Sequence, residues 1–397
     1  MKILMVAPQY PPYGKGGGSV FYEALCQKLA ERGHRITVIA GNYEKTLRID
    51  SPEEYKGKIN IIWIPLMEIL KMRYPQIQGS LPPSLRFLRY LMTINYAEYD
   101  VIHLLAFGHL LIDCVNLIAK SSRKILTIHA FQKYVEKEGG ASFPLKLLYQ
   151  MYLKTLGRHT LNSANTITTV SRFVAEECIK KGIPPSKIRV IPNGVELKRY
   201  TPVPYGELEE KFQIGKDDIL VLSIARLVWY KGFEYALEAI HKVLKATDKS
   251  IKYMIVGPIE EQNYYSTLNR QVKKLGIEQN VIFTGFISQN LKLQALTRTD
   301  VFLAPSLHEG FGLIIPEAMA LGKQVIASDC EGFKCIVNHM ETGILVKPAE
   351  SVEIANAILM LLENPKLGER LSQNAYYEAK KYDWEAIIGR YEKLYRH

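Results

Sequence analysis

Two carboxylates, Glu309 and Glu317, are the side chains best placed to do chemistry, and both lie in the stretch SLHEGFGLIIPEAMALGKQVIASD at 306–329. Glu309 lies in a loop with two glycines, where the backbone can approach a bound group closely. Glu317 follows a proline, which predicts the first turn of a short helix that ends near Gly322. Helix N-termini bind phosphate, whereas carboxylates accept hydrogen bonds from sugar hydroxyls. The stretch therefore predicts a ligand that is part phosphate and part polyol.

The size and composition of the chain indicate a globular protein of two domains. It has 397 residues, of which 47% are hydrophobic, and no run reaches the roughly 18 apolar residues that span a bilayer. The cysteines show no metal-ligand spacing, so we expect reduced thiols and no metal site; they are Cys26, Cys114, Cys178, Cys330 and Cys335. The net charge of +11 favours an anionic partner, which could be a nucleotide, an acidic lipid surface or a nucleic acid.

Apolar runs alternate with helical patterns along the whole chain, which predicts α/β structure with doubly wound parallel sheets. The expected strands of a first sheet are 2–7, 34–40, 59–64, 101–105, 124–128, 166–170 and 189–191. Ser171 is expected to cap the helix that follows 166–170. The expected strands of a second sheet are 219–224, 251–256, 280–284, 301–304, 324–327 and 343–346. The proline-containing segment KRYTPVPYGE at 198–207 is interpreted as the linker between two domains.

The glycine loop after the first expected strand differs from a nicotinamide-cofactor fingerprint. Ser19 stands where that fingerprint has its third glycine, and no acidic residue ends the second strand. We therefore do not expect NAD binding. A glycine loop that faces a cleft between two domains remains a sensible interpretation.

Motifs along nearly the whole chain resemble glycosyltransferase family 4, the retaining nucleotide-sugar transferases with the GT-B fold. They are the opening strand with its GGGS loop, TIHA at 127–130, TVS at 169–171, IPNGVE at 191–196, SIARLVWYKG at 223–232, VIFTGF at 281–286, the stretch from Glu309 to Glu317, and YDWEAIIGRYEKLY at 382–395. The resemblance implies two Rossmann-like parallel-sheet domains that face a central cleft. We expect an acceptor-side domain at 1–200, a nucleotide-sugar-binding domain at 205–375, and a C-terminal helix at 376–397 that returns to the first domain.

The resemblance assigns Arg226 and Lys231 to the diphosphate of the donor. A departing nucleoside diphosphate develops negative charge, which an arginine fork and a lysine can stabilise without a metal ion. Without the resemblance, both residues could be solvated surface cations.

The same resemblance places Glu309 on the donor sugar and Glu317 on the ribose hydroxyls. The backbone N–H groups of Phe311, Gly312 and Leu313 are expected to contact the phosphates and the sugar. Alternatively, Glu309 is an ordinary surface carboxylate, and Glu317 stabilises the helix through its interaction with the helix dipole.

Four further residues take site roles from the resemblance. Gly16 and Gly17 match the loop of the first domain that closes over the diphosphate and the reacting sugar. His129 matches a histidine near the transferred sugar, although a lone histidine after a strand is often structural. Ile282, in the VIFTGF motif, is expected at the nucleotide.

One segment departs from the family pattern. Many relatives have two glycines followed by an acidic residue where this chain reads EGFKCIV, so Glu331 replaces the first glycine and Cys335 replaces the acid. This departure puts fine donor specificity in doubt.

The expected activity is transfer of a hexosyl group from a nucleotide-diphosphate sugar, UDP- or GDP-hexose, to a glycan or lipid-linked acceptor. We favour attack from the leaving-group face, because no carboxylate in the motifs is placed as a nucleophile. The enzyme is expected to need no metal or other cofactor and to bind no nucleic acid. The alternatives are a nucleotide-binding GT-B protein without activity and a nucleotide-sugar epimerase.

Two basic and aromatic segments are candidates for the acceptor side. The first includes Lys71, Arg73, Tyr74, Arg86, Arg89 and Tyr90, and the second is FPLKLLYQMYLKTLGRH at 143–159. Either could rest on an anionic membrane or be a packed helix with a solvated face. The expected location is the cytoplasm, with peripheral contact at the inner face of the membrane left open.

Overall fold

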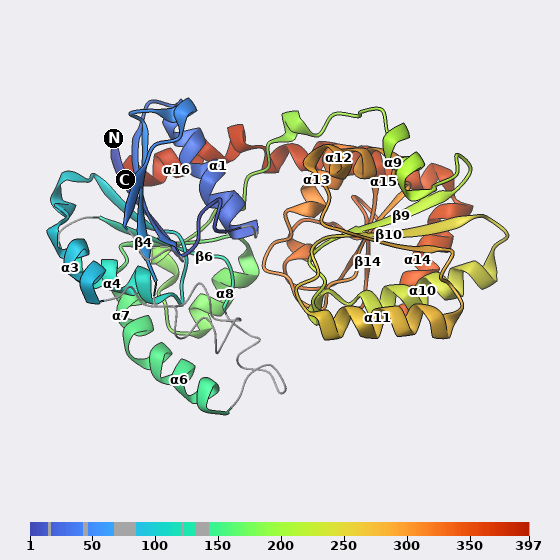
Figure 1. The fold of residues 1–397 in the computed structure, drawn as a ribbon, viewed down its shortest axis with the longest axis horizontal. Helices are drawn as coiled ribbons and strands as arrows, with labels where there is room; N and C mark the ends of the chain where they lie inside the picture. The colour runs from blue at the N-terminus through green and yellow to red at the C-terminus, as the bar shows by residue number, and fades with distance from the viewer. Residues whose placement is uncertain (15–16, 43–46, 67–84, 121–122, 132–142, 397) are drawn as a thin grey trace. The chain divides into compact units, whose positions relative to one another are not determined.

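The computed structural model of the chain describes residues 1–14, 17–42, 47–66, 85–120, 123–131 and 143–396. The chain divides into two compact units, of which the first is Met1–Asn193 together with Ile387–His397 and the second is Gly194–Ala386. The boundary therefore follows Asn193 rather than residue 200, and residues 376–386 belong to the second unit. Each unit is built on its own parallel sheet (Figure 1).

The first unit contains a sheet in the order β3-β4-β2-β1-β5-β6-β7-β8. Its strands are β1 (Lys2–Ala7), β2 (Arg35–Asn42), β3 (Arg48–Asp50), β4 (Ile59–Pro65), β5 (Val101–Leu104), β6 (Lys124–Ile128), β7 (Thr166–Thr169) and β8 (Ile188–Val190). The apolar runs predicted all of these strands except β3, with ends that differ by one or two residues. β3 is a short edge strand and pairs antiparallel with β4, whereas the other pairs are parallel.

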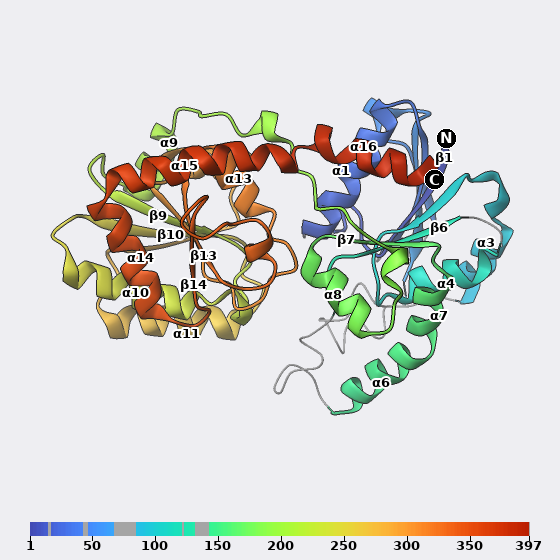
Figure 2. The same cartoon turned by 180° about the vertical axis from the view of Figure 1, so that it is seen from behind.

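Helices α1 (Gly17–Glu31) and α16 (Trp384–Arg396) pack against each other in the first unit (Figures 1 and 2). The rings of Phe21 on α1 and Tyr391 on α16 are 6.3 Å apart. The other helices of the unit are α3 (Leu85–Thr93), α4 (Leu110–Ile118), α6 (Phe143–Lys154), α7 (Leu156–Ser163) and α8 (Arg172–Lys180). The expected cap of α8 is confirmed, because Val174 N–H donates to Ser171 Oγ at 3.3 Å.

The second unit contains a sheet in the order β11-β10-β9-β12-β13-β14. Its strands are β9 (Ile219–Ile224), β10 (Ile251–Val256), β11 (Val281–Gly285), β12 (Val301–Ala304), β13 (Gln324–Ser328) and β14 (Ile344–Val346). Helices α10 (Phe233–Ala246), α11 (Gln262–Leu275) and α14 (Ser351–Glu363) cover one face, and α9 (Gly206–Phe212), α12 (Gln289–Arg298), α13 (Ile314–Ala320) and α15 (Pro365–Ala379) cover the other (Figure 1). Both faces are buried, which explains the continuous apolar runs of β9, β10 and β12.

The segment 198–207, interpreted from its prolines as a linker, packs on α12 instead. Val203 N–H donates to Thr297 Oγ1 at 3.4 Å, and Leu208 N–H donates to Gln294 Oε1 at 3.1 Å. Residues 201–205 have no regular secondary structure and connect the 3-10 helix Leu197–Arg199 to α9. We call residues 198–208 the strap.

The segment 143–159 forms two helices rather than one, because α6 ends at Lys154 and α7 begins at Leu156. Thr155 between them has φ −117° and ψ −99°, outside the helical region. Within the part of the chain that the structure describes, no helix is both long enough and apolar enough to cross a bilayer.

Candidate active site

Lys231 and Glu309 lie together beyond the carboxyl ends of β9 and β12. These two strands are neighbours, but the chain winds away from them in opposite directions, toward β10 and toward β13. Open α/β sheets bind their ligands at such a reversal of strand order. A small cavity of about 20 Å³ opens at this point, and Lys231, Glu309 and Phe333 are among the residues that line it.

The conformation of Lys231 is set by a tight turn. The 3-10 helix Trp229–Lys231 ends at Gly232, which has φ +68°. A Cβ at Gly232 would lie 2.3 Å from the carbonyl oxygen of Pro305, so only glycine fits between this turn and the end of β12. The neighbouring loop is fixed to the same turn, because Leu307 N–H donates to the Tyr230 carbonyl at 2.8 Å.

Lys231 and Glu309 form an ion pair between Nζ and Oε2, and their side chains are 12% and 21% exposed. Arg226 lies near Glu309, whose negative charge favours the charged form of the guanidinium group. Its guanidinium donates to Glu260 Oε2 at 2.7 Å and to the Tyr230 hydroxyl at 2.6 Å. Burial opposes the charge of Arg226, but Tyr230 and Glu260 outweigh burial and raise its pKa. The structure therefore brings the two expected diphosphate ligands and the expected sugar ligand into one cluster.

The loop from Glu309 to Leu313 stacks on the loop that contains Phe333. Gly312 has φ +88°, and a Cβ there would lie 2.4 Å from the Phe333 ring. A Cβ on Gly332 would lie 2.4 Å from the Glu309 carbonyl oxygen. The two glycines thus allow a backbone approach that no side chain permits. Phe311 is buried, with its ring 5.7 Å from the Tyr382 ring, so only its backbone is available to a ligand.

Helix α13 begins at Ile314, two residues before the proline that was expected to start it. The first backbone bonds of this turn run from Ile315 N–H to the Gly312 carbonyl and from Glu317 N–H to the Leu313 carbonyl. Glu317 is in the first turn, as predicted, and the helix stops before Gly322, which has φ +62°. The N–H groups of Gly312 and Leu313 come before these bonds, at the amino end of the helix.

Glu317 is ion-paired with a residue that sequence reasoning missed. Lys292 Nζ on α12 lies 2.5 Å from Glu317 Oε2. The hydroxyl of Tyr200, in the strap, hydrogen-bonds the same carboxylate. Burial and the negative charge of Glu317 raise the pKa of Tyr200, so the phenol stays protonated. No local pattern marks Lys292 or Tyr200, because both pairings are long-range.

The expected site residues of the first unit are described in part. Gly16 lies outside the described residues, and Gly17 is the first residue of α1. His129 follows β6 and packs between Phe21 and Tyr22, with ring centroids 5.2 and 5.4 Å away. Burial lowers the pKa of His129 to about 4, with a smaller effect from His109. Its Nε2 is buried and has no hydrogen-bond partner among the described residues.

Ile282 is not brought together with the other candidates. It lies near the beginning of β11, an edge strand, and pairs with Met254 on β10. The carboxyl end of β11, where a ligand would be expected, is three residues further on.

Cys335, at the position where relatives have an acid, stabilises its own turn. Its thiol donates to the Glu331 carbonyl at 3.2 Å. Among the described residues, no group of three or more His, Cys, Asp and Glu side chains is arranged to hold a metal ion.

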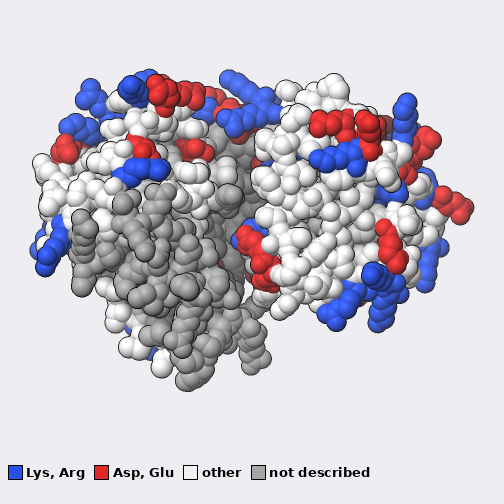
Figure 3. Space-filling model, in the orientation of Figure 1, with Lys and Arg blue, Asp and Glu red and all other residues white. Residues whose placement is uncertain are grey.

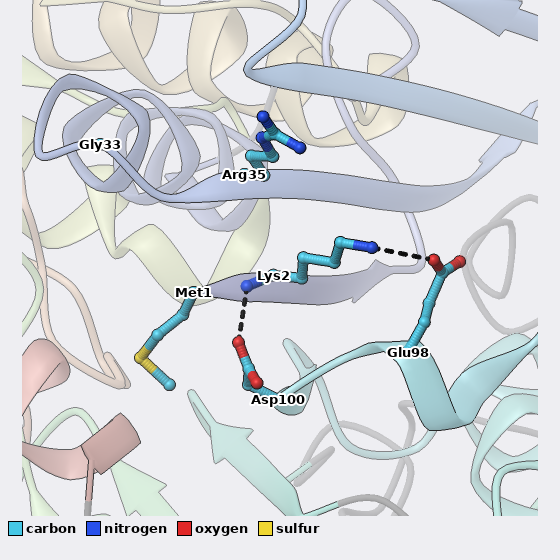
Figure 4. Close-up of a pocket in the computed structure, with 6 residues that line it drawn as sticks. All are labelled: Met1, Lys2, Gly33, Arg35, Glu98 and Asp100. Atoms are coloured by element: carbon cyan, nitrogen blue, oxygen red, sulfur yellow. Dashed lines mark hydrogen bonds and ion pairs between the residues drawn. The ribbon is translucent and has the colours of Figure 1, made fainter.

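A larger pocket of about 520 Å³ lies in the first unit, at the edge of the sheet where the parallel strands begin (Figure 4). It is lined by Met1, Lys2, Gly33, Arg35, Glu98 and Asp100. Lys2 Nζ is 3.2 Å from Glu98, and Lys2 N–H donates to Asp100 at 2.8 Å. This pocket contains none of the expected site residues. On the face shown in Figure 3, basic and acidic residues are interspersed rather than gathered into one basic stripe.

Two family models match the chain, "Glycosyltransferase Family 4" over residues 15–199 and "Glycosyl transferases group 1" over residues 205–378. An uncharacterised glycosyltransferase of Methanocaldococcus jannaschii is 27% identical over 100% of this chain and 98% of its own. The N,N'-diacetylbacillosaminyl-diphospho-undecaprenol alpha-1,3-N-acetylgalactosaminyltransferase of Campylobacter jejuni is 31% identical over 62% of this chain and 64% of its own. Anabaena HepE in complex with UDP-glucose superimposes with a TM-score of 0.77 at 22% identity, covering 100% of both chains.

Proposed function

Because the chain is a family 4 glycosyltransferase with the GT-B type of fold, we propose that it transfers a hexosyl group from a nucleotide-diphosphate sugar to a glycan or lipid-linked acceptor, with retention of anomeric configuration. The observation that carries this proposal is the cluster of Arg226, Lys231 and Glu309 at the reversal of strand order. Two cations and one carboxylate in one cluster suit a ligand that carries both phosphate and hydroxyl groups.

The cluster suits the cleavage of a sugar–phosphate bond. As the bond breaks, negative charge develops on the diphosphate, and the guanidinium and ammonium groups stabilise it. Glu309 accepts hydrogen bonds from hydroxyls of the sugar, and the Gly312 and Leu313 N–H groups donate to the phosphates. This division of roles needs no metal ion. The acceptor attacks from the face of the leaving group, and the donor phosphate takes its proton.

Two relatives support the choice of substrates. HepE has been crystallised with UDP-glucose, and the Campylobacter enzyme is named for a diphospho-undecaprenol acceptor. A nucleotide-sugar donor and a lipid-linked or glycan acceptor are therefore the substrates to test first.

Contact with an anionic membrane is part of the proposal for a lipid-linked acceptor. Leu147 and Met151 on α6 are 52% and 56% exposed and lie one helical turn apart. Lys154 follows on the same helix. Exposed apolar side chains beside a lysine can insert at an anionic interface. Of the other acceptor-side candidates, Lys71, Arg73 and Tyr74 lie outside the described residues.

Ligand-induced thermal stabilisation tests donor binding. The purified protein is heated with UDP, GDP, ADP or dTDP and with their hexose conjugates. A ligand at about 100 times its Kd stabilises the fold by roughly 2.7 kcal/mol. We therefore expect the nucleotides of one base to raise Tm by several degrees. The Lys231→Ala variant should lose this shift. If no nucleotide raises Tm, the donor assignment is wrong.

The same samples separate the alternatives. A nucleotide-binding protein without activity would show the shift but release no nucleoside diphosphate from its sugar conjugate. An epimerase would release a sugar epimer without any acceptor. A transferase should release nucleoside diphosphate slowly with water and faster with acceptor.

A further inference from the structure

The carboxylate of Glu317 is held by two side chains from different parts of the second unit. Lys292 Nζ lies 2.5 Å from Oε2, and the Tyr200 hydroxyl hydrogen-bonds the same group. The Lys292 ammonium also lies 5.8 Å from the centroid of the Tyr200 ring. The three side chains form one cluster, which we call the Glu317 clamp.

The clamp is largely shielded from solvent. The side chains of Lys292 and Glu317 are 20% and 14% exposed, and Tyr200 is buried. Exposed ion pairs contribute little because water screens them, whereas a shielded pair is more strongly coupled and its geometry more sharply defined. The side chain of Glu317 is therefore restricted to one orientation.

The elements that carry the clamp are fixed to each other by further bonds. Tyr200 lies in the strap, which bonds to α12 through Thr297 and Gln294. Lys292 lies on α12, whose first turn is capped by Ser288, with Leu291 N–H 3.3 Å from its Oγ. Thus α12 positions both partners of Glu317, one directly and one through the strap.

Two donors leave acceptor capacity on the carboxylate. An ionised carboxylate has about four lone-pair sites, and Lys292 and Tyr200 use two of them. The remaining sites match the two vicinal hydroxyls of a ribose, each of which donates one hydrogen bond. A carboxylate without partners would lose conformational entropy when it binds the ribose. A carboxylate that is already oriented does not have this entropic cost.

We propose that Lys292 and Tyr200 are positioning residues that orient the Glu317 carboxylate toward the ribose hydroxyls of the donor nucleotide, and so set its preference for a ribonucleotide. This inference rests on the proposed function, in which Glu317 binds the ribose. Lys292 and Tyr200 themselves act only through Glu317.

The test compares ribonucleoside and deoxyribonucleoside diphosphates by calorimetry. The probes are whichever of UDP, GDP and ADP binds most tightly, with its 2′-deoxy and 3′-deoxy counterparts. The variants are Lys292→Met, Lys292→Arg, Tyr200→Phe and Glu317→Gln. Lys273→Met, which removes an exposed lysine on α11, is the matched control for charge.

We expect wild type to prefer the ribonucleotide by about tenfold, the value of one good hydrogen bond. In Lys292→Met this preference should fall to about one, because ribonucleotide affinity drops while deoxynucleotide affinity is unchanged. Tyr200→Phe should lose part of the preference, and Lys292→Arg and Lys273→Met should keep it. At saturating donor, kcat should be unchanged in Lys292→Met while KM rises.

Two contrary results have different meanings. If Glu317→Gln loses the preference but Lys292→Met and Tyr200→Phe keep it, the positioning role is overturned and the ribose assignment stands. If Glu317→Gln keeps the preference, the ribose assignment itself fails, and the positioning role fails with it.

Discussion

Lys231 and Glu309 are ion-paired with each other, so a diphosphate that binds Lys231 must share or displace this carboxylate. The sequence motif identified both residues but gave no sign of their pairing. Likewise, it identified Glu317 but not Lys292 or Tyr200, because each partner lies on a distant segment with no distinctive local pattern. At the level of single residues, the sequence predicts candidate site residues, and tertiary contacts determine how their side chains are held.

The two cations are expected to act on the reaction rather than on folding. Replacing Lys231 or Arg226 by alanine should lower kcat/KM by about 100-fold or more, because in the proposed mechanism each stabilises charge on the leaving diphosphate. The free energy of unfolding should change by only about 1 kcal/mol or less for the more exposed Arg226. Steady-state kinetics and urea unfolding measure the two effects.

The control for this pair is Lys334→Ala, which removes a half-exposed lysine whose Nζ is 3.3 Å from Asp329. It should retain wild-type turnover. Near-normal turnover in Lys231→Ala and Arg226→Ala would contradict the diphosphate assignment.

Gly312 is expected to be required for the shape of the donor loop. Gly312→Ala forces a Cβ against the Phe333 ring at a positive φ, so it should destabilise the second unit and weaken nucleotide binding. Gly276→Ala is the matched control, since Gly276 has φ +67° but open space around a Cβ. We expect backbone strain in the control to lower the free energy of unfolding by about 1 to 2 kcal/mol, and Gly312→Ala to lower it more. Urea unfolding compares them, and equal costs would rule out the close approach.

At the level of elements, apolar runs predicted the strands well because most are buried on both faces, as the core of the second unit shows. β3 has the sequence RID and is mostly exposed at an edge, so no apolar run marks it. The prolines of the strap suggested a linker, but they gave no sign of its binding to α12, which depends on side chains that only the fold brings near. The break at Thr155 was also unpredicted, although Gly157 lies two residues further on, where a Cβ would be 2.8 Å from the Tyr152 ring.

Two histidines of the first unit, His103 on β5 and His129 after β6, should make its stability depend on pH. Burial lowers the pKa of His103 to about 3 and that of His129 to about 4, below the unfolded value near 6.5. Their contribution to the free energy of unfolding is complete above pH 6.5. It is lost as the pH falls toward the pKa values of the folded state, because the unfolded chain binds the protons first. Protonation linked to each histidine should lower the free energy of unfolding by up to about 1.4 kcal/mol for each unit that the pH falls in this range.

Amide hydrogen exchange of β6 between pH 6.5 and 4.5 measures this loss in the first unit. The His129→Asn variant should show a shallower loss than wild type, because only His103 then contributes. An identical slope in the two proteins would contradict the role assigned to His129 burial.

Helix α6 is expected to contribute to membrane contact. Leu147→Ser with Met151→Ser should lower co-sedimentation with anionic vesicles, because two exposed apolar side chains are lost. Val352→Ser, at 52% exposure on α14, is the matched control and should bind as wild type does. High salt should weaken binding further. Absence of wild-type sedimentation at low salt would refute membrane contact through this helix.

At the level of the whole molecule, both units use the same plan of a parallel sheet covered by helices, and both present their candidate residues beyond the carboxyl ends of strands. His129 follows β6 in the first unit, and Lys231 and Glu309 follow β9 and β12 in the second. The sequence predicted this plan because its two halves repeat the alternation of apolar strands and helices. It could not supply the acceptor or the base of the donor, since those depend on the shape of sites that no motif encodes.

Proton NMR of donor hydrolysis without acceptor tests both the retention of configuration and the role of Lys231. The purified protein is incubated with the nucleotide-hexose that stabilises it most, and the first-formed sugar anomer is recorded before it equilibrates. We predict slow release of nucleoside diphosphate and of hexose with the same anomeric configuration as the donor, and at least a tenfold slower release in Lys231→Ala. Release of the opposite anomer would exclude a retaining transfer, and equal rates in the two proteins would exclude the role of Lys231 in cleavage.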